Sequence, residues 1–327
     1  VAINDTWAFF FFFYELFQET HPTTLFSKRE ANIPFFKERF NRRLYQKDLY
    51  SFLAQNQVVF FEWSGEILAH ASHLPKQCGI VTRLHRYELY QWVNQINWSN
   101  VDHLILVSHA KEEEVHQLLP AMRGKTSVIP EGVNLSRFPF APHPFHKQLG
   151  ILCHISPRKR VYELVLAFAE LQLAEQGYTL HIGGGQHPKF GDYYFALHDL
   201  VKKLGIQKNV IFHDHVENAQ EWLANIDIFI SNSYSEGLQV SPLEAMASGQ
   251  YVISHHWGGA EELLLQEELF LTNTQMAEKI HAYANLTESQ KLEKLAALRQ
   301  RVESQFDILK IRREILDIIE FTGQKYT

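Results

Sequence analysis

Residues 233–253 read Ser-Tyr-Ser-Glu-Gly-Leu-Gln-Val-Ser-Pro-Leu-Glu-Ala-Met-Ala-Ser-Gly-Gln-Tyr-Val-Ile, a pattern that predicts a loop, a helix and a strand in succession. The apolar run 226–230 before them is typical of a buried strand. Glu236 and Gly237 therefore lie on a loop between the carboxyl end of a strand and the N-terminus of a helix. Open α/β sheets bind ligands at that place, where free backbone amides favour anions. The segment thus predicts a parallel α/β domain with an anion site.

Glu244 in the same segment has two interpretations. Ser241 is a good N-cap, Pro242 suits the first helical position, and Glu244 lies three residues after the cap, which matches a capping box. In that interpretation Glu244 only stabilises the helix. It leaves Glu236 unexplained, so a ligand-binding role for Glu244 stays open.

Short apolar runs alternate with helical patterns along the chain, which predicts βαβ units and parallel sheets. Three prolines within 139–144 interrupt this order, because proline continues neither a helix nor a central strand. We therefore expect an N-terminal Rossmann-like domain over 1–140 and a doubly wound domain over 141–305. A C-terminal helix over about 306–327 is expected to pack back on the first domain. The expected strands are 1–3, 57–61, 79–82, 103–107, 149–153, 178–182, 209–212, 226–230 and 251–253.

Composition and charge restrict the class of protein. The chain has 327 residues, 46% of them hydrophobic and 21% charged, which is typical of a soluble globular protein. Its formal net charge of −6 offers no positive field to a nucleic-acid backbone, so nucleic acid is not expected as a partner. The two cysteines, Cys78 and Cys153, support neither a disulfide framework nor a cysteine zinc site. A reducing, cytoplasmic setting is expected.

Two segments leave peripheral membrane contact open. The phenylalanines at 9–13 lie in an apolar run between Asp5 and Glu15 that is too short to span a bilayer, so neither a secretion signal nor a membrane anchor is expected. A buried first helix is favoured there, and a surface that touches a membrane or an acceptor is the alternative. For the helical pattern in 27–55, a solvated face and contact with an anionic acceptor or lipid surface are the alternatives. Its basic residues are Lys28, Arg29, Lys37, Arg39, Arg42, Arg43 and Lys47.

A cluster of cations follows the strand expected at 149–153. Arg158, Lys159 and Arg160 open the next helix, where the helix dipole disfavours positive charge. An anion that satisfies both the side chains and the helix amides would explain them, and exposed surface charge is the alternative.

Two further loops come after strands of the second half. Gly183, Gly184 and Gly185 either let a ligand approach the backbone or form a simple tight turn. They are not a dinucleotide fingerprint, because Pro188 stands where its third glycine belongs. The triplet His-Asp-His at 213–215 is not expected to bind metal, because adjacent residues of an extended segment point to opposite faces and no third ligand is evident.

With these residues the chain resembles the retaining glycosyltransferases of family 4, the glycosyl transferases group 1. The resemblance rests on their Glu-x7-Glu signature, matched by Glu236 and Glu244 with the run Glu-Ala-Met-Ala-x-Gly. It implies the GT-B fold, an α/β architecture of two facing Rossmann-like domains with parallel sheets and a cleft between them. It also implies that Glu236 approaches the donor sugar and that Glu244 binds the ribose hydroxyls. The amides that hold the sugar and the diphosphate would be those of Gly237, Leu238, Gln239 and Val240.

The resemblance implies a diphosphate clamp in the second domain. Lys159 matches a lysine that binds the donor diphosphate. The position of the family's arginine holds His154 instead, so Arg158 or Arg160 would supply the missing charge. The backbone at Gly184 and Gly185 would approach the donor. Backbone near Val216 would bracket the nucleobase.

In the first domain, His85 resembles a family histidine that faces the donor sugar across the cleft. A loop histidine with a satisfied local hydrogen bond is the alternative. The catalytic set implied is Lys159, Glu236 and His85. The family's acceptor-side glycine loop is replaced by Asn-Asp-Thr-Trp at 4–7, which departs from the pattern.

The resemblance implies a retaining hexosyltransferase in polysaccharide or glycoconjugate synthesis. The donor would be a nucleoside-diphosphate sugar, with the UDP-glucose type favoured, and the acceptor a saccharide or a lipid-linked molecule. No Asp-x-Asp motif occurs, so no metal and no cofactor is expected. The working mechanism is same-face attack, with the leaving phosphate taking the acceptor's proton. The alternatives are a catalytically silent sugar-nucleotide binder or scaffold and, less favoured because the glycine fingerprint fails, a nicotinamide-dependent oxidoreductase. Nothing in the sequence indicates an oligomeric state.

Overall fold

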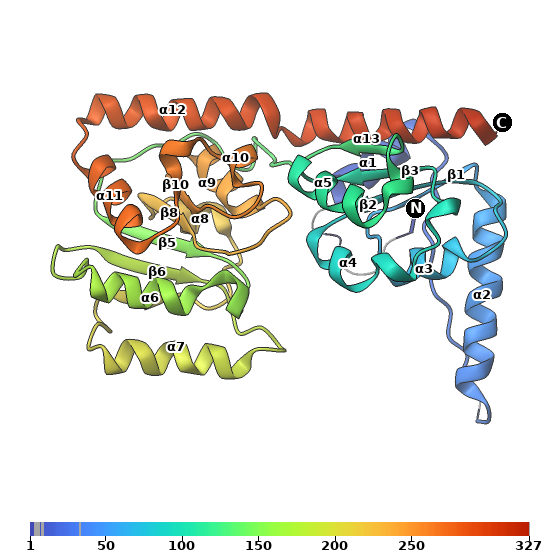
Figure 1. The fold of residues 1–327 in the computed structure, drawn as a ribbon, viewed down its shortest axis with the longest axis horizontal. Coiled ribbons are helices and arrows are strands. Elements are labelled where there is room, and N and C mark those ends of the chain that lie inside the picture. The colour runs from blue at the N-terminus through green and yellow to red at the C-terminus, as the bar shows by residue number, and fades with distance from the viewer. Residues whose placement is uncertain (3–6, 8–9, 33, 327) are drawn as a thin grey trace. The chain divides into compact units, whose positions relative to one another are not determined.

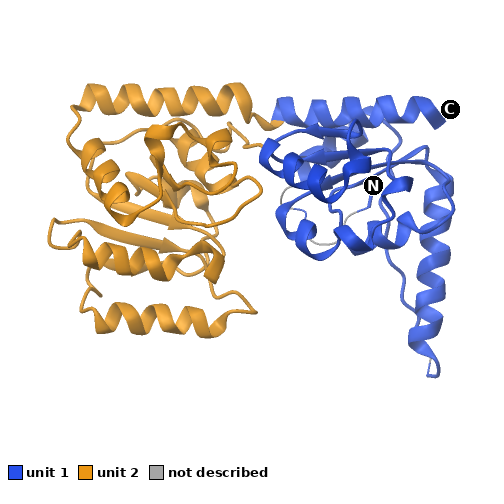
Figure 2. Ribbon diagram, viewed as in Figure 1, with its two compact units in different colours: residues 1–130, 309–327 blue, residues 131–308 orange. Residues whose placement is uncertain are grey.

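The computed structural model describes residues 1–2, 7, 10–32 and 34–326, and it divides into two compact units (Figures 1 and 2). Unit 1 comprises Val1–Pro130 and Leu309–Thr327, and unit 2 comprises Glu131–Ile308. The division falls at Pro130 rather than at residue 140. The reason is that the proline-rich segment packs on unit 2, where Phe138 is buried and the Ala141 amide donates to the Ser248 carbonyl at 3.0 Å.

Unit 1 is built on a four-stranded parallel sheet in the order β1-β2-β3-β4. The apolar runs predicted as its strands are buried, and Ala2 adds a parallel bridge to Phe61 beside β1. The predicted loop at 4–7 lies outside the described residues except for Trp7. The elements are α1 (Phe11–Thr20), α2 (Lys37–Gln55), β1 (Val58–Phe61), α3 (Glu66–Ser72), β2 (Gly79–Leu84), α4 (Arg86–Gln91), η1 (Val93–Gln95), η2 (Trp98–Asn100), β3 (His103–Leu106), α5 (His109–Leu118), η3 (Pro120–Met122) and β4 (Thr126–Val128), followed at the end of the chain by α13 (Ile308–Gly323) and η6 (Gln324–Tyr326).

The phenylalanine run lies partly in the core of unit 1, which agrees with the favoured prediction of a buried first helix. Phe10 and Phe13 are buried, and the Phe10 ring stacks on Phe60 of β1 with centroids 6.1 Å apart. Phe11 is half exposed, and Phe9 lies outside the described residues. Within the described ranges, no helix combines the length and the apolar composition needed to cross a membrane.

Unit 2 is a doubly wound α/β domain with the strand order β10-β9-β8-β5-β6-β7, all parallel. The chain winds outward from β5 in one direction and then outward from β8 in the other, so these two neighbours form the switch point at which such sheets bind ligands. The elements are β5 (Gln148–Leu152), η4 (Pro157–Lys159), α6 (Val161–Glu170), β6 (Thr179–Gly183), α7 (Gly191–Lys203), β7 (Val210–Phe212), α8 (Ala219–Leu223), β8 (Ile228–Ser231), α9 (Val240–Ser248), β9 (Tyr251–His255), α10 (Ala260–Leu263), η5 (Gln266–Glu268), β10 (Leu269–Phe270), α11 (Asn273–Ala284) and α12 (Glu288–Gln305).

The chain's last helices follow the predicted helical period. Helix α12 packs on α9 of unit 2, while α13 belongs from Leu309 onward to unit 1. There the Gly323 carbonyl accepts a bond from Gln57 at 2.9 Å, and the Tyr326 hydroxyl donates to Asp102 at 2.9 Å. Ile311 and Ile315 on the predicted apolar face of α13 are buried.

Candidate functional site

The candidate site lies in unit 2, where the loops after β5 and β8 meet. A small cavity opens at the carboxyl ends of these strands, and its lining includes Lys159, Ser233, Gln239 and Ser241. The Asn232 side chain donates to the Arg160 carbonyl at 3.0 Å, and the Arg158 guanidinium donates to the Ser235 carbonyl at 3.0 Å. These bonds hold the two loops together, although the loops are far apart in sequence.

Glu236 is the centre of this site. Its carboxylate forms ion pairs with Lys159, at 2.8 Å from Nζ to Oε1, and with Arg158. Only 7% of the residue is exposed. The structure thus brings together three residues that the sequence assigned to one donor site, and it gives Arg158 a direct contact with the charged group.

The charge of Glu236 follows from these neighbours. Burial alone would raise the pKa of the carboxyl, but Lys159 and Arg158, together with hydrogen bonds, lower it to about 2. The carboxylate is therefore ionised at neutral pH. Because two cations hold it, its oxygens are better suited to accept hydrogen bonds than to attack carbon as a nucleophile.

Gln239 braces the same carboxylate through its side chain. Its Nε2 donates to Glu236 at 2.8 Å and to the Ser233 hydroxyl at 3.0 Å, while its Oε1 accepts from Ser231. Gln239 is buried. The sequence assigned only its backbone amide to the donor, and this positioning role of the side chain became visible only in the structure.

Two loop residues beside the site have left-handed backbone conformations that are unusual for residues with a side chain. Arg160 has φ 51° at the N-cap of α6, and Asp214 after β7 has φ 48°. Such conformations cost about 1–3 kcal/mol each and persist where surrounding contacts impose them. The bond from Asn232 to the Arg160 carbonyl is one such contact.

The capping-box interpretation of Glu244 is wrong. Helix α9 begins at Val240 with Gln239 as its N-cap, so Ser241 is already inside the first turn. Within the described residues, the Glu244 carboxylate has no hydrogen-bonding partner. Burial raises its pKa to about 7, and Arg137 offsets this rise in part. Glu244 is thus a half-buried acid whose carboxylate has no hydrogen-bonding partner among the described residues, and its expected contact with the ribose stays a prediction.

In the glycine loop after β6, the backbone conformation and the packing explain why one position, Gly184, is glycine. Gly184 has φ +132°, and a Cβ there would lie 1.8 Å from the Cys153 carbonyl oxygen. The tight-turn interpretation therefore explains Gly184, whose amide donates to the Asp214 carbonyl at 2.7 Å. A Cβ at Gly185 would contact only His215, at 3.7 Å, so packing at this position does not require glycine. Val216 packs against the core beside β6.

His154 does not replace the charge of an arginine. Partial burial lowers its pKa, and the positive charge of Lys159 lowers it further. The imidazole is therefore neutral at pH 7. Any second cation for a diphosphate must come from Arg158 or Arg160.

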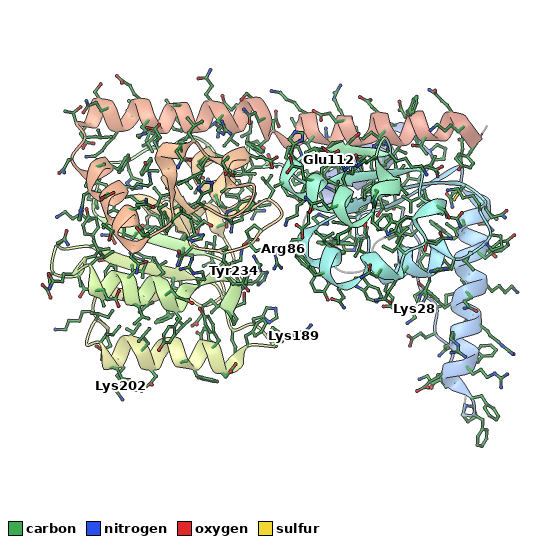
Figure 3. The ribbon with its side chains drawn as sticks, viewed as in Figure 1. Lys28, Arg86, Glu112, Lys189, Lys202 and Tyr234 are labelled. Atoms are coloured by element: carbon green, nitrogen blue, oxygen red, sulfur yellow. The ribbon has the colours of Figure 1, made fainter. Side chains whose placement is uncertain are left out.

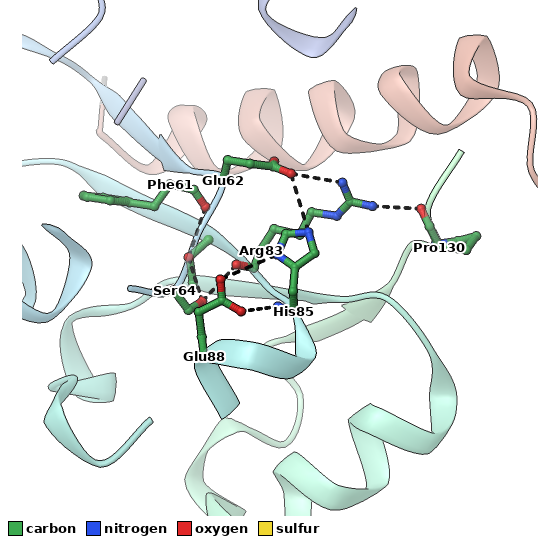
Figure 4. A network of polar contacts seen from close by, with 8 residues as sticks. Phe61, Glu62, Ser64, Arg83, His85, Glu88 and Pro130 are labelled. Atoms are coloured by element: carbon green, nitrogen blue, oxygen red, sulfur yellow. Dashed lines mark hydrogen bonds and ion pairs between the residues drawn. The ribbon is translucent and has the colours of Figure 1, made fainter. Parts of the chain in front are cut away.

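His85 lies in unit 1, at the carboxyl end of β2, in a buried polar network shown in Figure 4. Its amide donates to Glu88 at 3.1 Å, and its Nε2 lies 3.6 Å from the Glu62 carboxylate. Glu62 also pairs with the fully buried Arg83 at 3.2 Å. The centroid of the Trp63 ring lies 4.2 Å from that of the imidazole. The imidazole is thus surrounded by the carboxylate of Glu62 and the ring of Trp63, and both the expected role of His85 and its alternative stay predictions.

Potential metal ligands gather at the other end of the unit 2 sheet. Among the described residues, one group of three potential ligands has its ligand atoms within 4.8 Å of one another, formed by His143, His146 and Asp227. Asp227 precedes β8 and His146 precedes β5, so the group is at the amino ends of the strands, opposite the candidate site. Both nitrogens of His143 lie within 3.2 Å of backbone carbonyls, and its Nδ1 lies 3.5 Å from the Asp227 carboxylate, so the ring already has partners within the protein.

The His-Asp-His triplet is held by local contacts. His213 lies 2.8 Å from His181, and the Tyr194 hydroxyl donates to Asp214. Tyr234 lies two residues before Glu236 and is exposed on the loop after β8 (Figure 3).

Comparisons with known proteins agree on the family. Residues 144–305 match the model of the family described as glycosyl transferases group 1. N-acetyl-alpha-D-glucosaminyl L-malate synthase of Bacillus anthracis is 31% identical over 175 residues, which are 50% of this chain and 44% of that protein. Alpha-monoglucosyldiacylglycerol synthase of Streptococcus pneumoniae is 32% identical over 165 residues, covering 44% of this chain and 36% of that protein. The chain thus matches less than half the length of these curated relatives.

Solved structures agree over a larger share of the chain. Anabaena Alr3699/HepE, solved in complex with UDP and glucose, has a TM-score of 0.74 at 19% identity, covering 94% of this chain and 88% of that one. A glycosyltransferase from Rickettsia africae has a TM-score of 0.72 at 17% identity, covering 94% and 87%. These solved structures show the GT-B fold, and the match over residues 144–305 together with the curated relatives shows that the chain belongs to the glycosyl transferases group 1, of the family-4 type.

Proposed function

We propose that the chain is a retaining, metal-independent hexosyltransferase. Its donor would be a nucleoside-diphosphate sugar of the UDP-glucose type, and its acceptor a glycan or a lipid-linked molecule in polysaccharide or glycoconjugate synthesis. The observation that carries the proposal is the Glu236 carboxylate held by Lys159 and Arg158 at the switch point of unit 2. The complex of Alr3699/HepE with UDP and glucose supports the choice of donor.

Each group has a task in this proposal. Lys159 and Arg158 bind the diphosphate, Glu244 accepts bonds from the ribose hydroxyls, and Glu236 accepts a bond from a hydroxyl of the hexose. In the free chain Glu236 neutralises the two cations, so the diphosphate would compete with a carboxylate for them. His85, in unit 1, is the third residue of the proposed catalytic set. The carboxylate of Glu62 would hold its ring in place.

Transfer would proceed on one face of the sugar. The bond between the anomeric carbon and the phosphate oxygen breaks, and its electron pair stays on the diphosphate, where the two cations stabilise the charge. The acceptor oxygen forms the new bond from the same face, and its proton passes to the leaving phosphate oxygen. We assign no covalent intermediate, because the carboxylate of Glu236 is held by cations and not aimed as a nucleophile.

Calorimetry with UDP, GDP and ADP tests the donor, with exposed Lys202→Ala on α7 as the control variant. UDP should bind most tightly, and labelled UDP-glucose should be turned over in a strong chelator as fast as with magnesium. Loss of turnover in chelator, restored by magnesium or manganese, would refute metal independence. Absence of nucleotide binding would refute the site itself.

One observation favours a second candidate, a sugar-nucleotide binder without catalysis. The neutral His154 stands where the family has an arginine, so the charge available to the leaving group is smaller. Tight UDP binding with neither transfer nor hydrolysis of the labelled donor would support this candidate. A cytoplasmic protein with peripheral contact at the inner face of the membrane is the setting we propose for either candidate.

A further inference from the structure

We infer that the exposed N-terminal end of α2 docks on an anionic lipid bilayer, an inference that rests on the peripheral membrane contact proposed above and assigns it a surface. This end, residues 34–47, is called the α2 tip below. Helix α2 buries Tyr45, Leu49 and Leu53, so only its second half packs on unit 1. The first part projects away from the rest of that unit (Figure 1).

Three phenylalanines are exposed together at the tip. Phe35 is 76% exposed, Phe36 81% and Phe40 46%. Single exposed apolar residues are ordinary, but a contiguous aromatic patch marks an interaction surface. The Phe40 amide donates to the Phe36 carbonyl at 2.9 Å, so the two residues lie one helical turn apart on the same face.

The same face continues with positive charge. Arg43 and Lys47 follow Phe36 at helical spacings of seven and eleven residues, which places them beside the aromatic rings and opposite the buried Tyr45 and Leu49. The tip carries one acid, Glu38. Within the described residues, none of its cations forms an ion pair, whereas Lys28 outside the tip pairs with Glu30 at 3.2 Å. The cations of the tip are Lys37, Arg39, Arg42, Arg43 and Lys47.

The start of the helix adds to this positive end. Phe36 caps α2 in a left-handed conformation, and no side chain bonds to the first amides. The helix dipole therefore presents its positive end and free N–H donors at the same place as the phenylalanines.

A bilayer of anionic lipid matches both halves of the surface. Its headgroup phosphates would pair with the cations and the free amides, and its acyl boundary would receive the three rings. An acidic glycan would satisfy the cations, but it lacks the continuous hydrocarbon region in which three exposed phenylalanine rings can be buried together. The observations therefore favour a lipid surface over a glycan.

The test is co-sedimentation of the full chain with vesicles of phosphatidylcholine, with and without phosphatidylglycerol. The chain should bind the anionic vesicles, bind the neutral ones much more weakly, and lose binding as salt rises. The double variant Arg39→Gln/Arg43→Gln should weaken binding by about fivefold for each cation removed, which corresponds to about 1 kcal/mol. The double variant Phe36→Ser/Phe40→Ser should weaken binding at every salt concentration.

Matched controls are Phe195→Ser and Lys202→Gln on α7, whose side chains are exposed on unit 2 (Figure 3 shows Lys202). They should bind vesicles as the unchanged chain does. Melting curves of all the variants should coincide, because none of the replaced side chains is buried. Equal loss in the controls, or equal binding to neutral vesicles, would overturn the inference. So would the absence of vesicle binding combined with binding to heparin that the arginine variant weakens, because the tip would then serve an anionic glycan.

Discussion

Glu244 should lower the stability of the free chain while it serves the nucleotide, and Glu244→Gln separates the two effects. Burial raises the pKa of Glu244 from 4.5 to about 7. The folded chain therefore holds this proton more tightly than the unfolded chain does. The contribution of Glu244 to the free energy of unfolding falls as pH rises from about 4.5 to about 7, and the loss is complete above that range.

The magnitude follows from the same interval. At about 1.4 kcal/mol for each pH unit, the ionised carboxyl costs about 3 kcal/mol at most, and about 1–3 kcal/mol when its partial contact with solvent is considered. Glu244→Gln should therefore raise the melting temperature at pH 8 by several degrees and change it little at pH 4.5. The control, Glu278→Gln on the exposed side of α11, should change neither value.

Nucleotide binding should respond in the opposite direction. The variant loses a charged acceptor for the ribose hydroxyls, so its affinity for UDP should fall by about 1.5–3 kcal/mol at pH 8. The affinity of the unchanged chain should rise with pH up to about 7, and that of the variant should not. Melting curves and calorimetry at the two pH values check this. A lower melting temperature at pH 8, or an unchanged UDP affinity, would refute the reasoning and leave Glu244 without a ligand role.

Three further predictions concern the same site. Lys159→Ala should weaken UDP binding by about 1.5–3 kcal/mol in calorimetry, and an unchanged affinity would remove Lys159 from the diphosphate site. Glu236→Gln should keep or increase the affinity for bare UDP, because it frees the two cations, and it should lower kcat/KM for the sugar nucleotide. A loss of UDP affinity as large as that of Lys159→Ala would contradict the assignment of Glu236 to the hexose. Gly184→Ala should lower the free energy of unfolding by more than about 1 kcal/mol in denaturant titrations, because its Cβ would collide with the Cys153 carbonyl, and wild-type stability would show that the loop can move.

The strands that the sequence predicted and those it missed differ in burial and length. The central β3 (His103–Leu106) was expected at 103–107, because a strand buried on both faces reads as an apolar run. The edge strands β4 and β10 were missed. The first has three half-buried residues and the second has only two, so neither produces a clear pattern.

Helix starts were less predictable than helix positions. The pattern at 241–244 matched a capping box, yet α9 begins at Val240 because Gln239, with its extended backbone, is the N-cap and its side chain bonds to Glu236 and Ser233. The Gln239 side chain makes these bonds with residues of the loop before the helix, and the local pattern of residue types does not contain them.

The sequence by itself determined that Glu236 lies on a loop after a strand and before a helix, because strand, loop and helix are local patterns of residue type and spacing. It also placed Lys159 at the start of the helix that follows another strand. Only the tertiary structure decided that the two side chains meet. They are 77 residues apart, and the contact exists because β5 and β8 are neighbours in the sheet. Alternating strands and helices specify a parallel sheet without specifying which strands pair. The charge of Glu236 follows from that pairing and could not be predicted before it.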